Sequence, residues 1–516
     1  MKNRKLPMLK HLTLISISII AFSCSNDTKD GTNGKDGVNG QDGQNGKDAE
    51  LILDNAMFSN KSIVEPLVKI DPAFPNVRAY SLVSTVDVIG ENKFQLASTV
   101  DGAGLIKDDG NGFIYVVNCE DSYAIARLRL DNNLNPIKGD YLLNSGVADY
   151  SRQCSGTMWE KEIHGGDKDV FLSASEEEIS NVVKEMDPRV VTPNPTGSYG
   201  NPALGRFLWE NALPLPKDTY PGKTVILGGD DAADGQVILY YSENGDVDRT
   251  NGKVYVLRFK EVSDGPDGKK KAVDPNVKYT EDALDLKVTY DIEFVEVVDA
   301  KNKSERETSL ACTALNASAF IRMEDIDYQK GSAANARNLF FNVTGRGPGS
   351  GSVNDWGTVY KLELDANSPL KGKLTQIVSG NVTTNKKNGN LASLQSPDGI
   401  CVTENFVYIQ EDPNSFAKGH AAYIYQSDLN GNNIKKFLDL KIDHNLASNS
   451  TTIDDSGEFG SMVDISDKVG VPGTFLLAVQ AKYWQSDKFK GLDGHIHPIK
   501  ENDRASQIVI LRNVPR

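Results

Sequence analysis

Three charged side chains in the segment ASAFIRMEDIDYQ (residues 317–329) could do chemistry together. The segment begins with small and apolar residues that suit burial, and it then places Arg322, Glu324 and Asp325 almost side by side. In a strand, Arg322 and Glu324 would point to one face and Asp325 to the other. An arginine can hold a phosphate or carboxylate through two hydrogen bonds, and a buried glutamate needs a basic partner or a cation. The segment therefore indicates an anion-and-metal site; a surface strand or an internal ion pair of Arg322 with a glutamate is the alternative.

Two further segments place reactive side chains where each would need a partner. Glu210, in GRFLWENALPLP, has apolar residues on both sides, which predicts that it is buried. Cys154, in QCSGTMWEKE, lies among small polar residues, where an inert core cysteine is out of place. A thiolate beside carboxylates suits iron better than calcium. For Cys154 a half-buried thiol, or a disulfide with Cys119, stays open as the alternative.

Acidic residues recur where apolar runs end. They are Glu120, Glu177, Asp230, Asp231, Glu411 and Asp412. If the runs are strands beside the channel of a β-propeller, these residues converge on one mouth of that channel; wet loops after strands would give the same pattern without a site. Converging carboxylates repel one another, so protons or a bound cation must relieve the repulsion. Many oxygen ligands without a histidine cluster favour Ca²⁺ and disfavour zinc.

Short β-rich runs separated by Gly, Asn and Asp turns must position these residues. Six related units recur along the chain, which predicts an all-β fold, a six-bladed β-propeller with insertions. We expect the terminal run QIVILRN to close the ring by pairing with an early strand. The best candidate for a helix is SEEEISNVVKEMD, residues 175–187.

The N-terminus predicts export. Basic residues precede LTLISISIIAFSC, an apolar run too short to span a membrane comfortably, so it is typical of a signal peptide. The residues AFSC resemble a bacterial lipobox, in which Cys24 would be lipidated; an ordinary secretory signal is the alternative. Glycine recurs every third residue from Gly31 to Gly46 without proline, which favours a flexible tether over trimerisation through a collagen helix.

We therefore expect a lipoprotein signal in residues 1–24, a collagen-like Gly-rich tether in residues 25–50 and the propeller in residues 51–516. The protein would be an exported monomer, anchored through lipid at the periplasmic face or the cell surface. A net charge of −15 excludes nucleic acid as the expected partner. The widely spaced Cys119, Cys154, Cys312 and Cys401 do not predict a disulfide framework.

Taken in order, these segments resemble the PhoX-type alkaline phosphatases, a family built on a six-bladed propeller. The resemblance runs from about Phe113 to the C-terminus. It rests on YVVNCEDS for the family's Asn-His-Glu, on Cys154 with FLSASEE, on GRFLWE for Gly-Arg-Phe-x-x-Glu, on GGDD, on RMED for Arg-x-Glu, and on QSPDGICV for Ser-Pro-Asp-Asn.

The resemblance implies a cluster of iron and calcium ions that hydrolyses a small phosphorylated substrate outside the cytoplasm. The implied ligands are Glu210, Glu324 and the Cys154 thiolate at an iron centre (Fe³⁺), Glu120 and Glu177 on the Ca²⁺ side, and Asp230 or Asp231. Asn118 and Arg322 are the implied phosphate contacts.

Some positions depart from the family pattern. Cys119 stands where the family has histidine, Gly399 stands where it has asparagine, and EKEIHGGDKD is an extra segment. Only Lys482 offers itself as a second basic phosphate ligand. These departures favour the alternative of a non-catalytic surface lipoprotein that binds a ligand or partner with structural calcium. A calcium-only hydrolase of the lactonase or phytase kind would fit if Cys154 lies far from the carboxylates.

Overall fold

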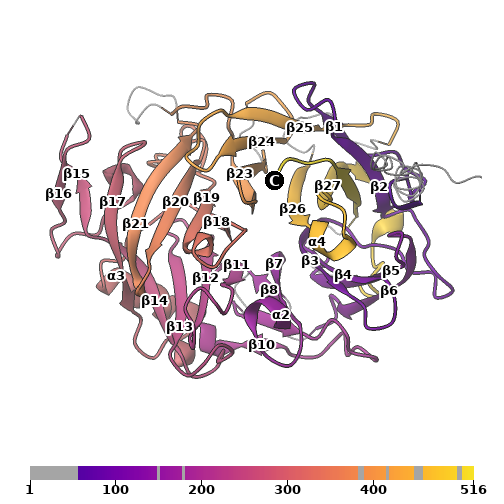
Figure 1. Cartoon of the computed structure of the whole chain (residues 1–516), viewed down its shortest axis with the longest axis horizontal. Coiled ribbons are helices and arrows are strands. Elements are labelled where there is room, and N and C mark those ends of the chain that lie inside the picture. The colour runs from indigo at the N-terminus through magenta and orange to yellow at the C-terminus, as the bar shows by residue number, and fades with distance from the viewer. Residues whose placement is uncertain are drawn as a thin grey trace, which may run out of the picture. The chain divides into compact units, whose positions relative to one another are not determined.

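Strands make up nearly all of the regular structure in the part of the chain that the computed structural model describes, and Figure 1 shows their sheets around a common centre. That part comprises residues 56–147, 151–176, 181–265, 267–381, 389–413, 418–446, 457–496 and 503–516. It belongs to one unit, Leu51–Arg516. Cys24, the tether and Glu177 lie outside the described residues.

Four sheets contain four or five antiparallel strands each. The first runs β3 (Val100–Lys107), β4 (Phe113–Cys119), β5 (Ala124–Leu130), β6 (Pro136–Leu143). The second runs β7 (Gln153–Trp159), β8 (Val170–Ser175), β9 (Val183–Met186), β10 (Gly200–Asn201). The third runs β22 (Pro397–Val402), β23 (Phe406–Glu411), β24 (Tyr423–Asp428), β25 (Lys435–Leu440), β1 (Val68–Ile70). The fourth runs β26 (Glu458–Asp464), β27 (Phe475–Gln485), β28 (Arg504–Arg512), β2 (Arg78–Ser84).

A nine-stranded sheet completes the arrangement. Its order is β11 (Trp209–Pro214), β12 (Thr224–Asp230), β13 (Val237–Ser242), β14 (Lys253–Phe259), β17 (Thr289–Glu296), β21 (Ser368–Ser379), β20 (Thr358–Asp365), β19 (Asn338–Val343), β18 (Met323–Tyr328). The two end strands, β11 and β18, contact each other, so the sheet is nearly closed. A separate ribbon pairs β15 (Glu261–Ser263) with β16 (Lys270–Ala272).

Helices are short in the described part of the chain. They are α2 (Lys161–His164), α3 (Glu305–Ala314), α4 (Ser466–Val469) and the 3-10 turns η1 (Pro202–Leu204), η2 (Glu281–Ala283), η3 (Ala300–Asn302), η4 (Asn335–Arg337) and η5 (Asp487–Phe489). The helix expected over residues 175–187 is wrong: β9 occupies Val183–Met186, because the β-branched Val183 is buried in a sheet. None of the helices seen in the described residues has the length and apolar character needed to cross a membrane.

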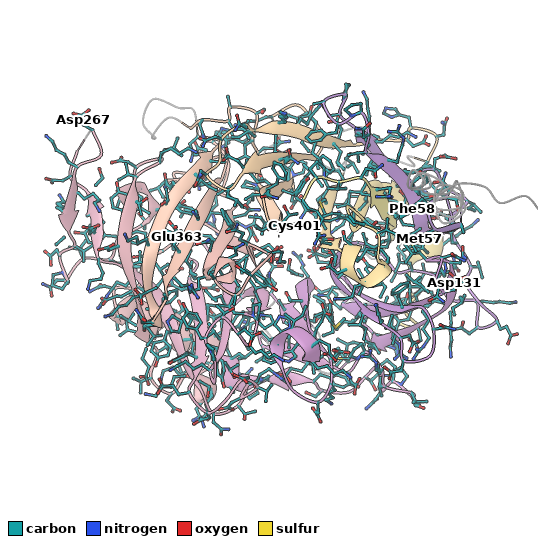
Figure 2. The ribbon with its side chains drawn as sticks, viewed as in Figure 1. Met57, Phe58, Asp131, Asp267, Glu363 and Cys401 are labelled. Carbon is teal, nitrogen blue, oxygen red and sulfur yellow. The ribbon has the colours of Figure 1, made fainter. Side chains whose placement is uncertain are left out.

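Apolar side chains fill the spaces between consecutive sheets (Figure 2). Between the first two sheets, Ile114 and Val116 of β4 pack with Phe171 of β8. Between the fourth and first sheets, Leu476 of β27 packs in one cluster with Leu105 of β3. Each fully buried side chain of this kind stabilises the fold by about 1.5–3 kcal/mol. The arrangement is therefore all-β and propeller-like, with a core between every pair of neighbouring sheets.

The last strand closes the arrangement with an early one. β28 pairs with β2, so that Leu511 lies opposite Ala79 and Ile510 lies opposite Tyr80. The pairing predicted for the terminal run QIVILRN is confirmed.

Six innermost strands surround the centre in the described part of the chain: β3, β7, β11, β18, β22 and β26. Each contacts the next, and β26 contacts β3, so the circle closes. Near its first residues, every one of these strands has a register shift of the bulge kind against its neighbour in the sheet. A bulge releases residues from the regular alternation and re-aims their side chains. Because this irregularity recurs at the same end of all six strands, it can direct side chains from each strand toward one site.

Candidate metal and anion site

A polar cavity of about 190 Å³ lies where the innermost strands begin. Ten carboxylic acids line it: Asp101, Glu120, Asp121, Glu176, Glu210, Asp231, Glu324, Asp398, Asp412 and Glu458. The other lining residues are the thiol of Cys154 and four bases, Arg152, Arg322, Lys482 and Arg504. If all of these acids and bases were ionised, the cavity would hold an excess of six negative charges. Such an excess cannot stay buried without protons or added cations.

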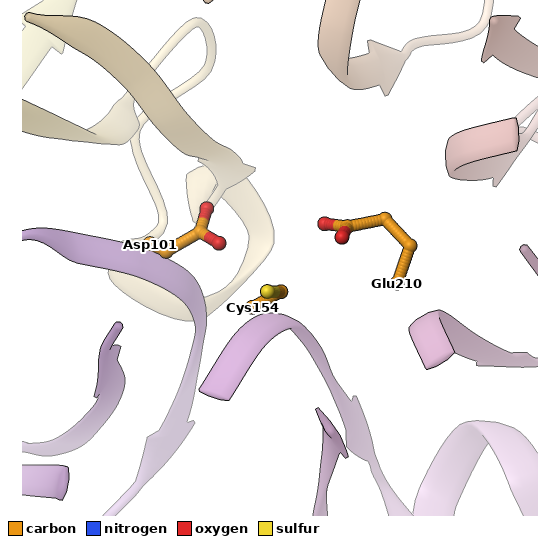
Figure 3. A group of neighbouring side chains, drawn as sticks. All are labelled: Asp101, Cys154 and Glu210. Carbon is orange, nitrogen blue, oxygen red and sulfur yellow. The ribbon is translucent and has the colours of Figure 1, made fainter. Parts of the chain in front are cut away.

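The bulges supply the inner ring of this site. In five of the innermost strands, the first residue released by the bulge lines the cavity: Asp101, Cys154, Glu210, Glu324 and Asp398. Figure 3 shows Asp101, Cys154 and Glu210 directed toward one another. The following residue of the bulge points elsewhere, as Asp325 does toward Asn211 and the amide of Ile400.

The outer ring comes from the strand beside each of four innermost strands, β3, β7, β11 and β22. Where that strand ends, the chain places Glu120 after β4, Glu176 after β8, Asp231 after β12 and Asp412 after β23. This ring is the one that the acidic residues at the ends of apolar runs predicted. Because neighbouring strand residues point to opposite faces, a shift of one position decides which carboxylate faces the cavity.

Arg322 is fixed by two carboxylates. Its Nε and Nη2 donate to Oδ1 and Oδ2 of Asp231 at 2.8 and 2.9 Å, and Nη2 lies 3.1 Å from Oε1 of Glu324. The residue precedes β18 and has a φ of 64°, so Arg322 and Glu324 reach the same cavity through a left-handed residue and a bulge, not through regular strand alternation. This backbone conformation costs roughly 1–3 kcal/mol for a residue with a side chain, and the amide of Arg322 helps to hold it by donating to the carbonyl of Ala232 at 3.0 Å.

Three other bases also lie between pairs of acids or beside one acid. The contacts are Arg152 Nη1 with Glu120 and Glu176, both at 3.4 Å, Lys482 Nζ with Glu458 at 2.5 Å and Asp412 at 3.7 Å, and Arg504 Nη1 with Asp121 at 3.1 Å. Together with Arg322, these bases form ion pairs with seven of the ten carboxylates.

The remaining three carboxylates, Asp101, Glu210 and Asp398, have no ion pair with a base among the described residues. Burial raises the pKa of each well above its ordinary value, and the neighbouring carboxylates raise it further. Oε1 of Glu324 is also buried without a hydrogen bond among the described residues, because its contact with Arg322 lacks hydrogen-bond geometry. Apart from one long hydrogen bond, from the amide of Ser155 to Oε1 of Glu210 at 3.4 Å, these oxygens converge without donors among the described residues, which is what a cation site requires.

The donor set fits polyvalent cations. Four groups of three ligand atoms lie within 4.8 Å of one another: Asp101–Cys154–Glu210, Glu120–Cys154–Glu176, Glu176–Glu210–Asp231 and Glu210–Glu324–Asp398. Carboxylate oxygens suit hard cations such as Ca²⁺, and a thiol added to them suits a transition metal such as iron.

Cys154 lies within this set. Its Sγ donates to Oε2 of Glu176 at 2.9 Å, and burial raises the pKa of the thiol well above its ordinary value. Cys119 and Cys154 are both free and buried, so the disulfide alternative is wrong. The calcium-only alternative required Cys154 to be remote from the carboxylates, and this condition is not met.

The structure does not bring every predicted residue to the cavity. Asn118 is fully buried in β4, where its Nδ2 donates to the carbonyl of Cys154 at 2.6 Å and its Oδ1 accepts from Ser173 Oγ at 3.0 Å. The side chain therefore holds the Cys154 bulge in place and does not face an anion in the cavity. Of the adjacent aspartates, Asp231 lines the cavity, whereas Asp230 accepts from the amide of Leu208 at 3.0 Å.

Glu411 also points away from the cavity. It is fully buried and accepts hydrogen bonds from the amides of Gln395 and Tyr423, both at 2.9 Å. The lining residues that the sequence did not single out as site residues are Asp101, Asp121, Arg152, Glu176, Asp398, Glu458 and Arg504. Three of them had a sequence signal: Asp121 lies in the motif YVVNCEDS, Glu176 directly precedes the predicted Glu177, and Asp398 lies in the motif QSPDGICV.

The fold and the site together define a propeller-like protein with a buried acidic cavity. No family model matches the chain, and no curated protein matches it in sequence. Among solved structures, it is similar to Pseudomonas fluorescens PhoX in complex with vanadate, a transition state analogue, with 14% identity and a TM-score of 0.57 over 88% of this chain and 98% of that one. This similarity shows a PhoX-like fold.

Two other solved structures are more distant. The AfRom2 CNH domain has 10% identity and a TM-score of 0.32 over 84% of this chain and 98% of its own. A GH43 β-1,3-galactosidase has 9% identity and a TM-score of 0.31 over 83% of this chain and 94% of its own. TM-scores this low carry no argument about fold or function.

Proposed function

We propose that the protein is a metal-dependent phosphate ester hydrolase. The observation that carries the proposal is the presence, in one cavity, of three buried carboxylates and a thiol without basic partners beside the fixed arginine Arg322. A carboxylate-lined cavity alone would repel a phosphate ester, whereas cations held by those carboxylates would attract it. The PhoX-like fold, and the vanadate that the PhoX structure contains, support the same chemistry.

The fold that we propose for this enzyme is a six-bladed propeller. Each of the innermost strands would lead one blade, and the nine-stranded sheet would comprise two blades, β11–β14 and β18–β21, joined through β17. Merging of two blades at their outer strands explains why the described sheets number fewer than the innermost strands.

The residues that would hold the cations follow from the pairing in the cavity. Asp101, Glu210, Asp398 and Cys154 have no base to neutralise them, so they would be central ligands. Glu324, Glu120 and Glu176 adjoin them within the same groups of ligand atoms. We propose Ca²⁺ for the oxygen-only groups and an iron ion, Fe³⁺, where Cys154 takes part. When bound, such cations supply positive charge for phosphoryl oxygens and lower the pKa of water.

Arg322 would bind and orient the phosphoryl group. Asp231 occupies Nε and Nη2 of its guanidinium, and no described residue accepts a hydrogen bond from Nη1. The side chain of Arg322 is 23% exposed, so the edge of the guanidinium that carries Nη1 can reach a substrate. A guanidinium held by a buried carboxylate needs no reorganisation to donate to a developing negative charge, which is how such groups stabilise a transition state.

An arginine substitution tests the proposal. Hydrolysis of p-nitrophenyl phosphate by Arg322→Ala should fall by roughly 100- to 1,000-fold in kcat/KM, as when one fixed donor to a transition-state oxygen is removed. Arg258→Ala is the matched control, because Arg258 pairs with Glu293 at 2.6 Å on the nine-stranded sheet outside the cavity. Equal activity in Arg322→Ala and the control would contradict the role of Arg322. Retained calcium without any hydrolysis by the wild-type protein would favour the non-catalytic binding alternative.

We also propose that this hydrolysis takes place outside the cytoplasm. The predicted lipoprotein signal with Cys24 and the Gly-rich tether would anchor the propeller, residues 51–516, to a membrane as a monomer. Small phosphorylated molecules are the proposed substrates, because the cavity is small and almost wholly polar.

A further inference from the structure

The fourth sheet, β26–β27–β28–β2, breaks the pattern of both rings. At the bulge where five innermost strands place an acid or a thiol, β26 has Gly460. A Cβ at this position would lie 2.7 Å from Cα of Asp101 and 2.8 Å from the carbonyl oxygen of Val100, so no ligand side chain fits there. The position that holds an outer-ring carboxylate in other sheets is taken in β27 by Gln480, which donates to Oε2 of Glu120 at 2.9 Å, and Lys482, two residues further along β27, lines the cavity.

Lys482 lies among carboxylates in the way that a cation would. Its Nζ is 2.5 Å from Oε2 of Glu458 and 3.7 Å from Oδ1 of Asp412. Its side chain is 18% exposed. Burial lowers the pKa of the ammonium group, but Asp412, Glu458 and Glu120 raise it by more, so this pKa lies above its ordinary value. The ammonium group therefore stays charged next to these acids.

The remaining acids divide the cavity into two parts. Asp412 and Glu458 belong to none of the groups of ligand atoms that could hold a metal among the described residues. All the groups that could hold a metal consist of residues from the other sheets, beginning with Asp101 in the first sheet and ending with Asp398 in the third. The lysine thus stands on the side of the cavity where the metal-ligand groups end.

We propose that Lys482 takes the place of a metal ion on this side of the cavity, so that the chain itself supplies a positive charge between Asp412 and Glu458. The idea rests on the proposed function only in assuming that cations occupy the opposite side. An ammonium group at 2.5 Å offers three donors and one positive charge without depending on the supply of metal. This chain therefore needs fewer bound cations than its ten carboxylates suggest.

Removing the charge of Lys482 should create a cation site. Lys482→Met keeps most of the length of the side chain but leaves Asp412, Glu458 and Glu120 without its charge, and hard cations prefer such groups of carboxylates. We expect the purified variant to bind about one more calcium ion per chain than the wild type, measured by elemental analysis after dialysis against Ca²⁺. Its melting temperature should drop in chelator and rise with Ca²⁺ by more than that of the wild type.

Two controls separate this effect from general loss of charge. Lys330→Met removes a lysine that is also 2.5 Å from a carboxylate, that of Asp327, but in a different cavity, and its calcium content should not rise. Lys482→Arg keeps the positive charge and should keep the wild-type count. If Lys482→Met does not fold in chelator, refolding on addition of Ca²⁺ supports the inference, and failure to fold with Ca²⁺ overturns it.

The outcomes also separate this inference from the proposed function. Equal calcium content in the wild type and Lys482→Met, with equal response of the melting temperature to Ca²⁺, overturns the role of Lys482. A wild type that binds no metal contradicts the proposed function, but a Lys482→Met variant that then gains calcium still supports the inference.

Discussion

Replacing Asn118 with alanine is the perturbation whose consequences the structure defines most closely. Its Nδ2 donates to the carbonyl of Cys154 at 2.6 Å from the neighbouring sheet, and the side chain is fully buried. Asn342 repeats the contact two sheets further on, with its Nδ2 at 2.9 Å from the carbonyls of both Asp398 and Gly399. In each case an asparagine beside an innermost strand holds the bulge of the next one, and the bulge carries a candidate metal ligand.

The expected size of the effect follows from what Asn118→Ala leaves behind. A buried carbonyl that loses a donor costs about 1–3 kcal/mol of stability. The position of Cys154 is also loosened, and the loss of a group that orients a metal ligand typically weakens metal binding by about 10- to 100-fold. We therefore expect a lower melting temperature in chelator together with weaker metal binding in a titration. Asn342→Ala should behave in the same way.

Asn338→Ala is the matched control for both variants, because Asn338 donates to Oε1 of Gln329 at 2.8 Å and does not contact a bulge that lines the cavity. It should leave metal binding unchanged. The reasoning is refuted if Asn118→Ala raises KM for a phosphate ester while its stability and metal affinity stay at the wild-type values, since a substrate contact and not a positioning role would produce that result.

Three further predictions concern pH, metal removal and Asp231. Burial raises the pKa of Glu281 from 4.5 to about 7, so the folded state keeps a proton that the unfolded state releases, and stability falls as pH rises through this window. Glu281→Gln should flatten that part of the melting profile; an unchanged slope would count against the assignment. The carboxyl groups without basic partners also have raised pKa values, so chelation should lower the melting temperature more at pH 8 than at pH 5, where protons replace cations; equal shifts at both pH values would contradict this. Asp231→Asn should lower kcat/KM for a phosphate ester by at least about ten-fold because it weakens the hold on Arg322, whereas Asp230→Asn should not; similar losses in both would argue against the choice of Asp231.

Much of the outer ring of the site could be predicted from the sequence. Glu120, Asp231 and Asp412 follow apolar runs, and such runs are visible in a sequence because buried strands need them. The same signal could not choose between Glu176 and Glu177, since one position decides the face of the strand. It also could not exclude Glu411, whose carboxylate is buried outside the cavity and accepts hydrogen bonds from backbone amides.

The inner ring was harder to predict, because a bulge leaves no mark in the pattern of apolar residues. Glu210 and Cys154 stood out as polar residues in unexpected surroundings and as parts of motifs that resemble a known family, whereas Asp101 had no such signal. The place of Arg152 depends on its contact with Glu120 of the preceding sheet, and that of Lys482 on its contacts with Glu458 of its own sheet and with Asp412 of the preceding one. The merged nine-stranded sheet was likewise beyond reach, since it arises from pairing of β14 with β17 and of β17 with β21, outside the repeated unit.

Elemental analysis of the purified protein and its Glu210→Gln variant tests the central claim most directly. Glu210 belongs to three of the four candidate groups of metal ligands and has no basic partner among the described residues. Glu411→Gln is the matched control, because Glu411 is an equally buried carboxylate outside the cavity. We predict calcium and iron in the wild type and the control, and loss of metal in Glu210→Gln. A wild type purified without chelator that holds no metal, or a Glu210→Gln variant with the full content, would contradict the account.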